Sequence, residues 1–239
     1  MFNKIMSPPS IDWPTKFKRK LESARNEQLK AYYQAGIPEA DTPLDEVTFL
    51  AMDFETTGLD SEQDDIITIG TVPFTLNRIL VNQAKHWTVR PRKPLAEESV
   101  VIHGITHSDV LDAPDLTEVY PQVLAEMSNR IMVVHYQRIE REFFNRALQT
   151  RIQEGIEFPV VDTMNIETLW QQKENGGLLN KMRGRKPESV RLGASRSRYG
   201  LPQYTPHHAL TDAVATAELL QAQIAYHYER KMPISQLWI

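Results

Sequence analysis

Two acidic residues interrupt an apolar run of strand length in the first quarter of the chain. The run covers residues 49–58, and the acids are Asp53 and Glu55. Residues i and i+2 of a β-strand point to the same face, so the two carboxylates project side by side. Like charges at this distance repel each other, and a hard divalent cation that prefers carboxylate oxygens would relieve that repulsion. The spacing therefore predicts a metal-binding strand, against the simpler alternative of a strand end whose carboxylates reach water.

Two later segments each place a histidine and an acidic residue five positions apart. His207 precedes Asp212, and His135 precedes Glu140 in a stretch predicted to be helical. Neither pair is informative alone, because a histidine near an acid is common in loops and on helices. Together with the acidic strand they supply enough carboxylates for a metal site and a histidine beside it.

Taken in chain order, these motifs resemble those of the DEDDh 3′–5′ exonuclease family. That family includes the proofreading epsilon subunit of bacterial DNA polymerase III and RNase T-like enzymes. The resemblance extends over about residues 47–220. The segments that carry it are Asp53-x-Glu55, His103-Gly104-Ile105-Thr106, Glu140, His207-x4-Asp212 and residues 213–218.

The resemblance implies an α/β fold: a ribonuclease H-like mixed β-sheet flanked by helices. It implies a hydrolase that releases nucleoside monophosphates from single-stranded 3′ ends, with DNA favoured, using two Mg²⁺ or Mn²⁺ ions. The alternatives are an exonuclease for RNA or oligoribonucleotides, and a pseudoenzyme that only binds nucleic-acid ends. The implied metal ligands are Asp53, Glu55, Glu140 and Asp212, and His207 completes the catalytic set as general base.

The same resemblance implies a wall of side chains against the terminal base and sugar. Plain core packing is an equal alternative for Met52, and the histidines of this group are more often loop or packing residues than ligands. The implied substrate-binding residues are Met52, Phe54, Thr56, Leu59, His103, Ile105, His135 and Tyr136.

The chain departs from the family pattern at two of these positions. Glu140 stands where the family has Asp, and the extra C–C bond lengthens the side chain by about 1.5 Å. A misplacement of about 1 Å in a catalytic site can cost roughly a hundredfold in rate, so the second metal site is expected to be shifted or weak. Tyr136 replaces the usual Asn. The sister subfamily has a Tyr at the position of His208, so the histidine-type motif fits better.

Composition indicates a globular protein in a reducing compartment. The chain has 239 residues, no cysteine, a net charge of −4 and no apolar run long enough for a membrane span. We expect a cytoplasmic protein that binds single-stranded nucleic acid and no membrane. The predicted parts are an N-terminal helical extension (1–45), an exonuclease domain (46–230) and a C-terminal tail (231–239). The extension is predicted as one amphipathic helix over residues 11–35 that packs on the domain, with a protein partner or a basic nucleic-acid arm as alternatives.

Hydrophobic patterns place the remaining elements. Strands are expected over residues 66–72, 79–89, 131–134 and 160–161, and helices over 115–127, 138–154 and 207–228. Thr205 and Pro206 have the residue types of an N-cap and first helical position, and Asp162 those of an N-cap. Seven basic residues lie between 181 and 200, where we predict a loop and then a short helix including Arg191. Phosphate contacts are the predicted role of the group, and a solvated surface is the alternative, favoured for any single arginine.

Overall fold

A computed structural model describes residues 11–93, 110–175 and 188–239 of the chain. Five strands form one mixed sheet in the order β3-β2-β1-β4-β5. The antiparallel half contains β1 (Phe49–Thr56), β2 (Ile66–Phe74) and β3 (Lys85–Thr88), and the parallel half adds β4 (Ile131–Val134) and β5 (Val160–Asp162). The prediction of a mixed sheet is confirmed, with β1 at its centre.

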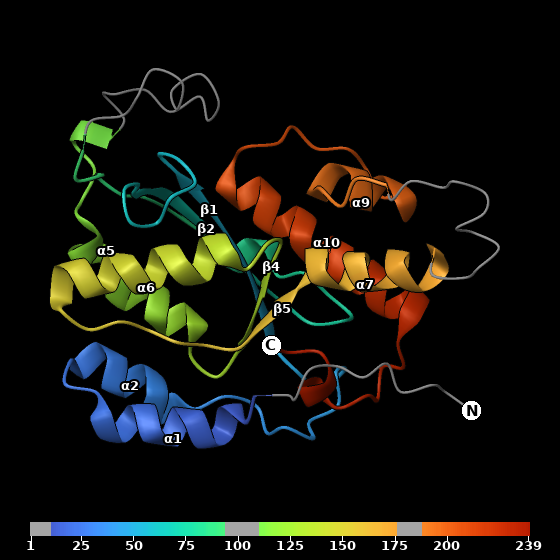
Figure 1. Cartoon of the computed structure of the whole chain (residues 1–239), viewed down its shortest axis with the longest axis horizontal. Helices are drawn as coiled ribbons and strands as arrows, with labels where there is room; N and C mark the ends of the chain where they lie inside the picture. The colour runs from blue at the N-terminus through green and yellow to red at the C-terminus, as the bar shows by residue number, and fades with distance from the viewer. Residues whose placement is uncertain (1–10, 94–109, 176–187) are drawn as a thin grey trace.

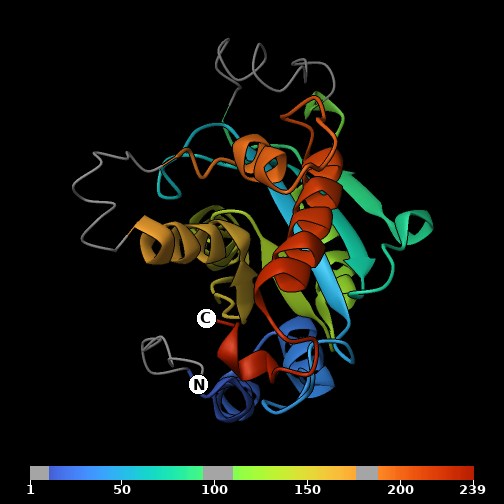
Figure 2. The same ribbon diagram turned by 90° about the vertical axis from the view of Figure 1, so that its right-hand side faces the viewer.

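Helices cover both faces of this sheet. In Figure 1, α5 (Leu116–Met127) and α6 (Arg138–Ile152) lie to one side, and α7 (Thr163–Asn175), α9 (Leu192–Arg198) and α10 (Ala209–His227) lie to the other. Figure 2 shows α10 crossing the sheet, where it packs on β1 and β2. The residues of β4 and β5 are all buried, as expected for parallel strands covered on both faces.

Gly70 of β2 determines how closely α10 can approach the sheet. A Cβ atom at this position would lie 2.3 Å from the backbone carbon of Ala209, the first residue of α10. Gly70 is paired with Asp53 of β1 and with His86 of β3, so these three residues form one row across the sheet. The missing side chain lets the N-terminal turn of α10 rest on this row and brings it directly beside Asp53.

The segments before and after the domain belong to the same hydrophobic core. α1 (Trp13–Ser23) buries Trp13 and Phe17, and α2 (Glu27–Ala35) buries Leu29 and Tyr32, in the cluster that contains the sheet. Trp238, near the other end of the chain, belongs to the same cluster. The short 3-10 helix η2 (Ile234–Gln236) precedes a backbone pairing of Ile239 with Val160 of β5. The predicted packing of the extension on the domain is therefore confirmed.

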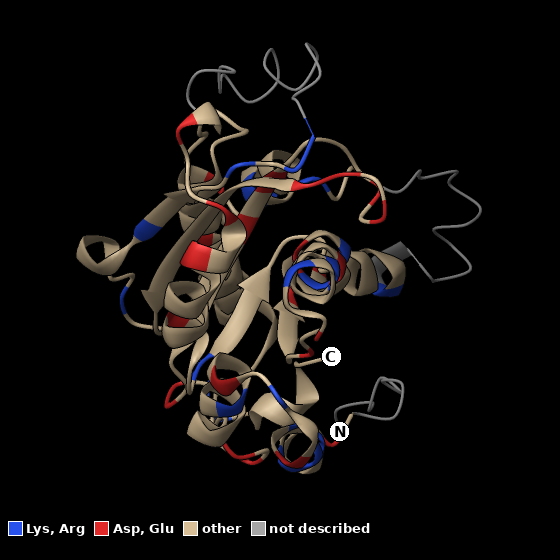
Figure 3. Cartoon of the chain, turned by 90° about the vertical axis from the view of Figure 1, so that its left-hand side faces the viewer, with Lys and Arg blue, Asp and Glu red and all other residues tan. Residues whose placement is uncertain are grey.

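One predicted helix proves to be two. Asn26 ends the continuity between α1 and α2, because its side-chain oxygen accepts hydrogen bonds from the backbone N–H groups of Gln28 and Leu29 as an N-cap. The predicted end of the second helix at Gly36 is confirmed, with φ at 73°. Figure 3 shows both basic and acidic residues on these two helices, with four basic residues against one acid in α1. Two of the four, Lys16 and Lys20, pair with Glu157 in the segment before β5, so they bind the domain itself.

Two other predicted boundaries differ from the structure. The strand expected over residues 79–89 is divided: the 3-10 helix η1 (Val81–Gln83) occupies its first half, and β3 begins only at Lys85. The last helix begins at Ala209, and His208 is its N-cap. The N-cap assignment of Thr205 was wrong because the ring nitrogen Nδ1 of His208 accepts from the N–H of Thr211 at 3.4 Å and takes that role.

Candidate active site

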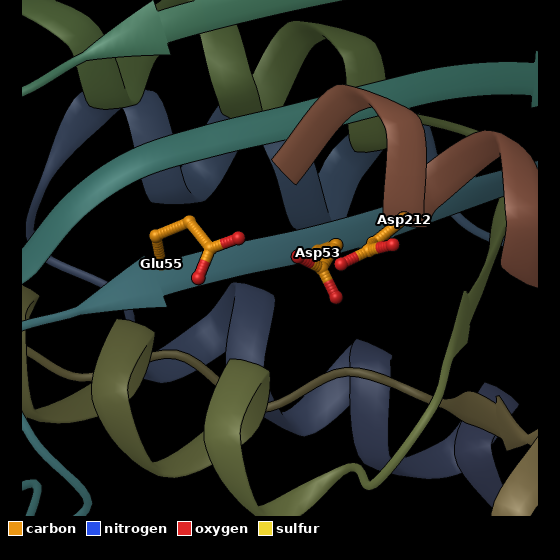
Figure 4. Close-up of side chains that lie close together, drawn as sticks. All are labelled: Asp53, Glu55 and Asp212. Atoms are coloured by element: carbon orange, nitrogen blue, oxygen red, sulfur yellow. The ribbon is translucent and has the colours of Figure 1, made fainter. Parts of the chain in front are cut away.

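Three carboxylates converge on the face of the sheet that α10 covers. Asp53 and Glu55 project from β1 and Asp212 from the first turn of α10 (Figure 4). Each offers one oxygen, and these oxygens all lie within 4.8 Å of one another. Two structural causes produce this cluster: the two-residue repeat of the strand and the close contact of α10 with Gly70. The sequence motifs predicted both contributors, from segments about 160 positions apart.

The cluster has the electrostatics of a site built for cations. Burial raises the pKa of Asp53 well above its usual range, and the neighbouring carboxylates of Glu140, Glu55 and Asp212 raise it further. The pKa of Asp212 is also raised, by burial first and by Glu55, although a backbone hydrogen bond from His207 acts in the opposite direction. Without a cation these groups favour sharing protons. A hard divalent ion would replace those protons and bind the carboxylate oxygens.

Glu140 lies near this trio but is not one of its members. It is in the first turn of α6 and only 2% exposed, and its Oε2 atom is buried without a hydrogen-bond partner. Burial raises the pKa of Glu140 well above its usual range, while hydrogen bonds with the backbone of Glu140 and of Phe54 lower it. β4 pairs with β1 only as far as Ala51, so Phe54 lies on the part of β1 beyond that pairing. An orphaned carboxylate oxygen beside three other acids is a donor suited to a second cation.

His207 is exposed and lies just before α10. Its backbone N–H donates to Oδ2 of Asp212 at 2.9 Å, and its φ of 70° is in the left-handed region. The prediction that it occupies the first helical turn was wrong, because the helix starts two residues later. The bond to Asp212 nevertheless fixes its backbone at the edge of the carboxylate cluster.

Two further histidines, His86 and His208, lie beside the carboxylates. His86 is in the same row of the sheet as Asp53 and Gly70. His208 stacks on His86 of β3, with ring centroids 5.0 Å apart and an interplanar angle of 16°. Burial lowers the pKa of His86, and His208 lowers it further, while Glu55 raises it. Sequence reasoning missed His86, because only the register of β3 on β2 brings it to the site.

The predicted substrate wall divides into exposed and buried residues. Leu59 is 85% exposed on the loop after β1, and Tyr136 is 40% exposed. Met52 is fully buried, which corrects its prediction as a substrate contact to a packing role. Phe54 is also buried and packs on Phe144 of α6, with ring centroids 6.0 Å apart. Thr56 is buried, and its hydroxyl donates to the carbonyl of Gly58 at 2.6 Å. His103 and Ile105 lie outside the described residues, as does the loop that contains them.

Asp162 organises the turn that leads into α6. Its carboxylate accepts backbone N–H bonds from Tyr136 and Gln137, at 3.1 and 2.9 Å, and also from Met164 and Asn165 in the first turn of α7. The predicted N-cap is therefore present. The same residue holds Tyr136 at a φ of 89°, a backbone region that is costly for a residue with a bulky side chain.

His135 has a packing role in the described structure, which corrects its prediction as a substrate contact. Its two ring nitrogens contact the hydroxyl of Thr163 at 2.8 Å and the carbonyl of Val190 at 2.9 Å. Burial lowers the pKa of this imidazole. A ring with both nitrogens in internal hydrogen bonds has no polar atom left for a substrate.

The basic stretch of residues 181–200 is only partly within the described residues. Lys181, Arg183, Arg185 and Lys186 lie outside the described residues. Of the later ones, Arg198 pairs with Glu167 at 2.8 Å, and Arg196 is only 2% exposed and pairs with Glu218. The prediction of phosphate contacts is therefore wrong for these two arginines, because their guanidinium groups are held by the protein itself. The predicted short helix is confirmed as α9, with Arg191 at its N-cap.

Comparison with known proteins assigns the domain. The family model RNase_T, described as "Exonuclease", matches residues 50–220, which is well over half of the chain. This chain belongs to that exonuclease family. The matched range begins in β1 and ends in α10, and so includes all five strands and every carboxylate of the site. The predicted resemblance is confirmed, and with it the prediction of a nuclease-type hydrolase domain.

Curated relatives give the same result. The exonuclease is 31% identical over 180 residues to a DNA polymerase III subunit epsilon-like protein of Rhodobacter capsulatus, covering 75% of this chain and 24% of that protein. It is 29% identical to DNA polymerase III subunit epsilon of Treponema pallidum, covering 76% and 78%. A PolC-type DNA polymerase III of Thermotoga petrophila is 30% identical, with 75% and 12% covered. The chain thus spans a quarter or less of the Rhodobacter and Thermotoga proteins and about three quarters of the Treponema one.

Solved structures confirm the fold. Exonuclease X in complex with 5′ overhanging duplex DNA superposes with a TM-score of 0.57 and 23% identity, covering 79% of this chain and 99% of that one. The nuclease domain of 3′hExo, a DEDDh family member bound to rAMP, gives 0.61 and 18%, covering 79% and 96%. Within the residues that the structure describes, no helix is both long and apolar enough to cross a membrane.

Proposed function

We propose that this exonuclease removes nucleoside monophosphates from the 3′ ends of single-stranded nucleic acid, with DNA as the favoured substrate. The observation that carries the proposal is the convergence of Asp53, Glu55 and Asp212, whose oxygens lie within 4.8 Å of one another. Two curated relatives are named as DNA polymerase III subunit epsilon or epsilon-like proteins, which supports DNA over RNA.

The residues of the site fit divalent cations. Asp53, Glu55 and Asp212 would hold one ion, and the buried, unpartnered Oε2 atom of Glu140 is the donor available for a second. All are hard oxygen ligands of the kind that Mg²⁺ and Mn²⁺ prefer. When bound, such a pair activates water and stabilises the leaving oxygen in phosphodiester hydrolysis.

The protein's own contributions are positioning and proton transfer. The backbone bond from His207 to Asp212 holds the histidine beside the carboxylates, and its imidazole would accept the proton of the attacking water. Leu59 and Tyr136 are the exposed side chains of the predicted wall, and they would contact the terminal nucleotide. Base–aromatic stacking tolerates any sequence, which suits an enzyme that degrades a strand one nucleotide at a time.

A pseudoenzyme that binds ends without cleaving them is the second candidate. Its support is the position of Glu140 outside the trio of converging oxygens. The raised pKa of Glu140 and its orphaned oxygen argue against it, because a buried acid costs free energy that a purely binding surface does not require.

The test uses 5′-labelled DNA and RNA single strands of the same sequence, with Mg²⁺, Mn²⁺ or EDTA. We expect metal-dependent, stepwise shortening from the 3′ end, faster on DNA. Asp53→Ala and Asp212→Ala should abolish it while circular dichroism remains that of the parent. Binding of 3′ ends without nucleotide release by the parent protein would establish the pseudoenzyme instead, and parent-rate cleavage by either variant would show the site to be misassigned.

A further inference from the structure

Arg196 lies in an environment that a solvated basic residue does not have. It is 2% exposed in α9, although it belongs to a stretch rich in Lys and Arg. Taking a guanidinium group out of water is costly unless nearly all of its hydrogen bonds are replaced. Its replacement partners come from two other parts of the chain, α10 and the loop that precedes it.

The guanidinium group of Arg196 joins α9, α10 and the loop between them. Nη1 donates to the carbonyl of Ala215 in α10 at 2.6 Å, and Nη2 donates to the carbonyl of Pro202 in the loop at 2.9 Å. Nη2 also donates to Oε2 of Glu218 in α10 at 2.7 Å. The planar fork of Arg is suited to holding several acceptors in fixed directions, which a flexible Lys ammonium cannot do.

Tyr204 completes the arrangement from the loop side. Its hydroxyl donates to Oε1 of Glu218 at 2.9 Å, and its ring lies over the guanidinium group of Arg196, 4.5 Å from the ring centroid. Glu218 therefore receives one hydrogen bond from α9 and one from the loop, each on a different oxygen. We name these three residues, Arg196, Tyr204 and Glu218, the loop clamp.

Tyr204 of the loop clamp lies three residues before His207. The loop covers residues 199–208 and has no regular secondary structure after its first turn. At its far end the N–H of His207 is bonded to Asp212. The backbone that carries the histidine is thus held on both sides: by Tyr204 before it and by Asp212 after it. A segment without a helix or strand needs such contacts, because fixing each residue costs about 1–2 kcal/mol in backbone entropy.

We propose that the loop clamp positions His207 for proton transfer, with Arg196, Tyr204 and Glu218 as positioning residues that do not touch the substrate. The inference rests on the proposed role of His207 as general base. A displacement of about 1 Å at such a group can reduce the rate by roughly a hundredfold. The clamp connects an exposed loop to the most deeply buried arginine of the described chain, and its loss would therefore reduce turnover more than binding.

The first experiment is a double-mutant cycle with Tyr204→Phe and His207→Ala, measured under single-turnover conditions with Mn²⁺ and a short DNA strand. Tyr204→Phe removes the hydrogen bond to Glu218 and keeps the ring, so folding is preserved. We expect a loss of about tenfold in the rate, as for one hydrogen bond to a charged group. The apparent affinities for DNA and for Mn²⁺ should stay within twofold of the parent values. In the His207→Ala background the same change should alter the rate less than twofold.

The outcomes separate the clamp from the proposed function. An equal loss in both backgrounds would overturn the clamp proposal and leave His207 as the base. A parent rate for His207→Ala would instead remove the proposed general base, and the clamp proposal with it. Tyr226→Phe, on the last turn of α10 and 69% exposed, is the matched control and should keep the parent rate.

A second measurement does not depend on activity. Glu218→Gln leaves Tyr204 in place but weakens its anchor and that of Arg196. Chymotrypsin should then cleave after Tyr204 several-fold faster than in the parent protein, with Tyr226→Phe as control and with equal cleavage when both proteins are unfolded. Parent-like cleavage of folded Glu218→Gln would show that the clamp does not hold the loop.

Discussion

Replacing Asp53 by Asn should stabilise the metal-free protein while it abolishes catalysis. The oxygens of Asp53, Glu55 and Asp212 lie within 4.8 Å of one another. At an effective dielectric constant of ~20, two full charges at that separation repel each other by about 3.5 kcal/mol. Burial and the neighbouring carboxylates raise the pKa of Asp53, the direction that favours its protonated form and so relieves part of this repulsion. We therefore expect a net gain of about 1–2 kcal/mol, or roughly 2–8 °C in Tm for a chain of this size.

The gain in Tm from Asp53→Asn should depend on pH, because Asp53 titrates and asparagine does not. The pKa of Asp53 is higher in the folded state than in the unfolded chain, mainly because the group is buried. The contribution of Asp53 to the free energy of unfolding of the parent is therefore fully present below the unfolded pKa of about 3.9. That contribution is lost as the pH rises through the folded pKa. An asparagine does not titrate. The difference in Tm between Asp53→Asn and the parent should thus be small near pH 4 and largest near pH 8.

Thermal unfolding in EDTA, followed by calorimetry from pH 4 to pH 8, measures this difference. Asp41→Asn removes one charge from an exposed position away from the site and serves as the matched control. Added Mg²⁺ should raise the Tm of the parent and have a smaller effect on Asp53→Asn, because the variant has lost a ligand. A lower or unchanged Tm for Asp53→Asn across the whole range would refute the view that the carboxylates repel one another in the folded protein.

Two further predictions concern the second metal and the contact of α10 with the sheet. Glu140→Gln should weaken Mn²⁺ binding, measured by calorimetric titration, far more than Glu140→Asp, because a charged carboxylate binds the ion more strongly than a neutral amide oxygen; parent-like binding by both variants would exclude Glu140 as a ligand. Gly70→Ala should lower the free energy of unfolding by at least about 2 kcal/mol and reduce activity, because the new Cβ would meet the backbone of Ala209 at 2.3 Å; denaturant titration measures this loss, and a parent-like midpoint would show that α10 can retreat without cost.

The features predictable from the sequence are those that depend on local pattern. The two-residue spacing of Asp53 and Glu55 survives in the structure because a strand imposes it. β4 was predictable as a buried strand because the four apolar residues 131–134 leave no polar face. Family motifs then linked these local signals to Asp212, a contact that no local pattern contains. The mixed sheet follows from the order of the domain's elements, in which three strands come first and the later strands alternate with helices.

The features that sequence reasoning missed depend on tertiary contacts. His86 reaches the site only through its register opposite Gly70. Arg196 was assigned to a phosphate-binding group by its charge, and only the fold shows that Ala215, Pro202 and Glu218 surround it. The start of α10 was misplaced because a histidine is an uncommon N-cap, whereas Thr205 has the usual residue type.

The longer side chain of Glu140 has a structural explanation in the position of its helix. α6 begins beyond the point where β4 stops pairing with β1, and Glu140 in its first turn lies near enough to β1 to raise the pKa of Asp53. An aspartate at the same backbone position would be about 1.5 Å shorter. The extra methylene thus extends the carboxylate from the helix, and its Oε2 atom, buried and without a hydrogen-bond partner, is the donor that remains for a cation.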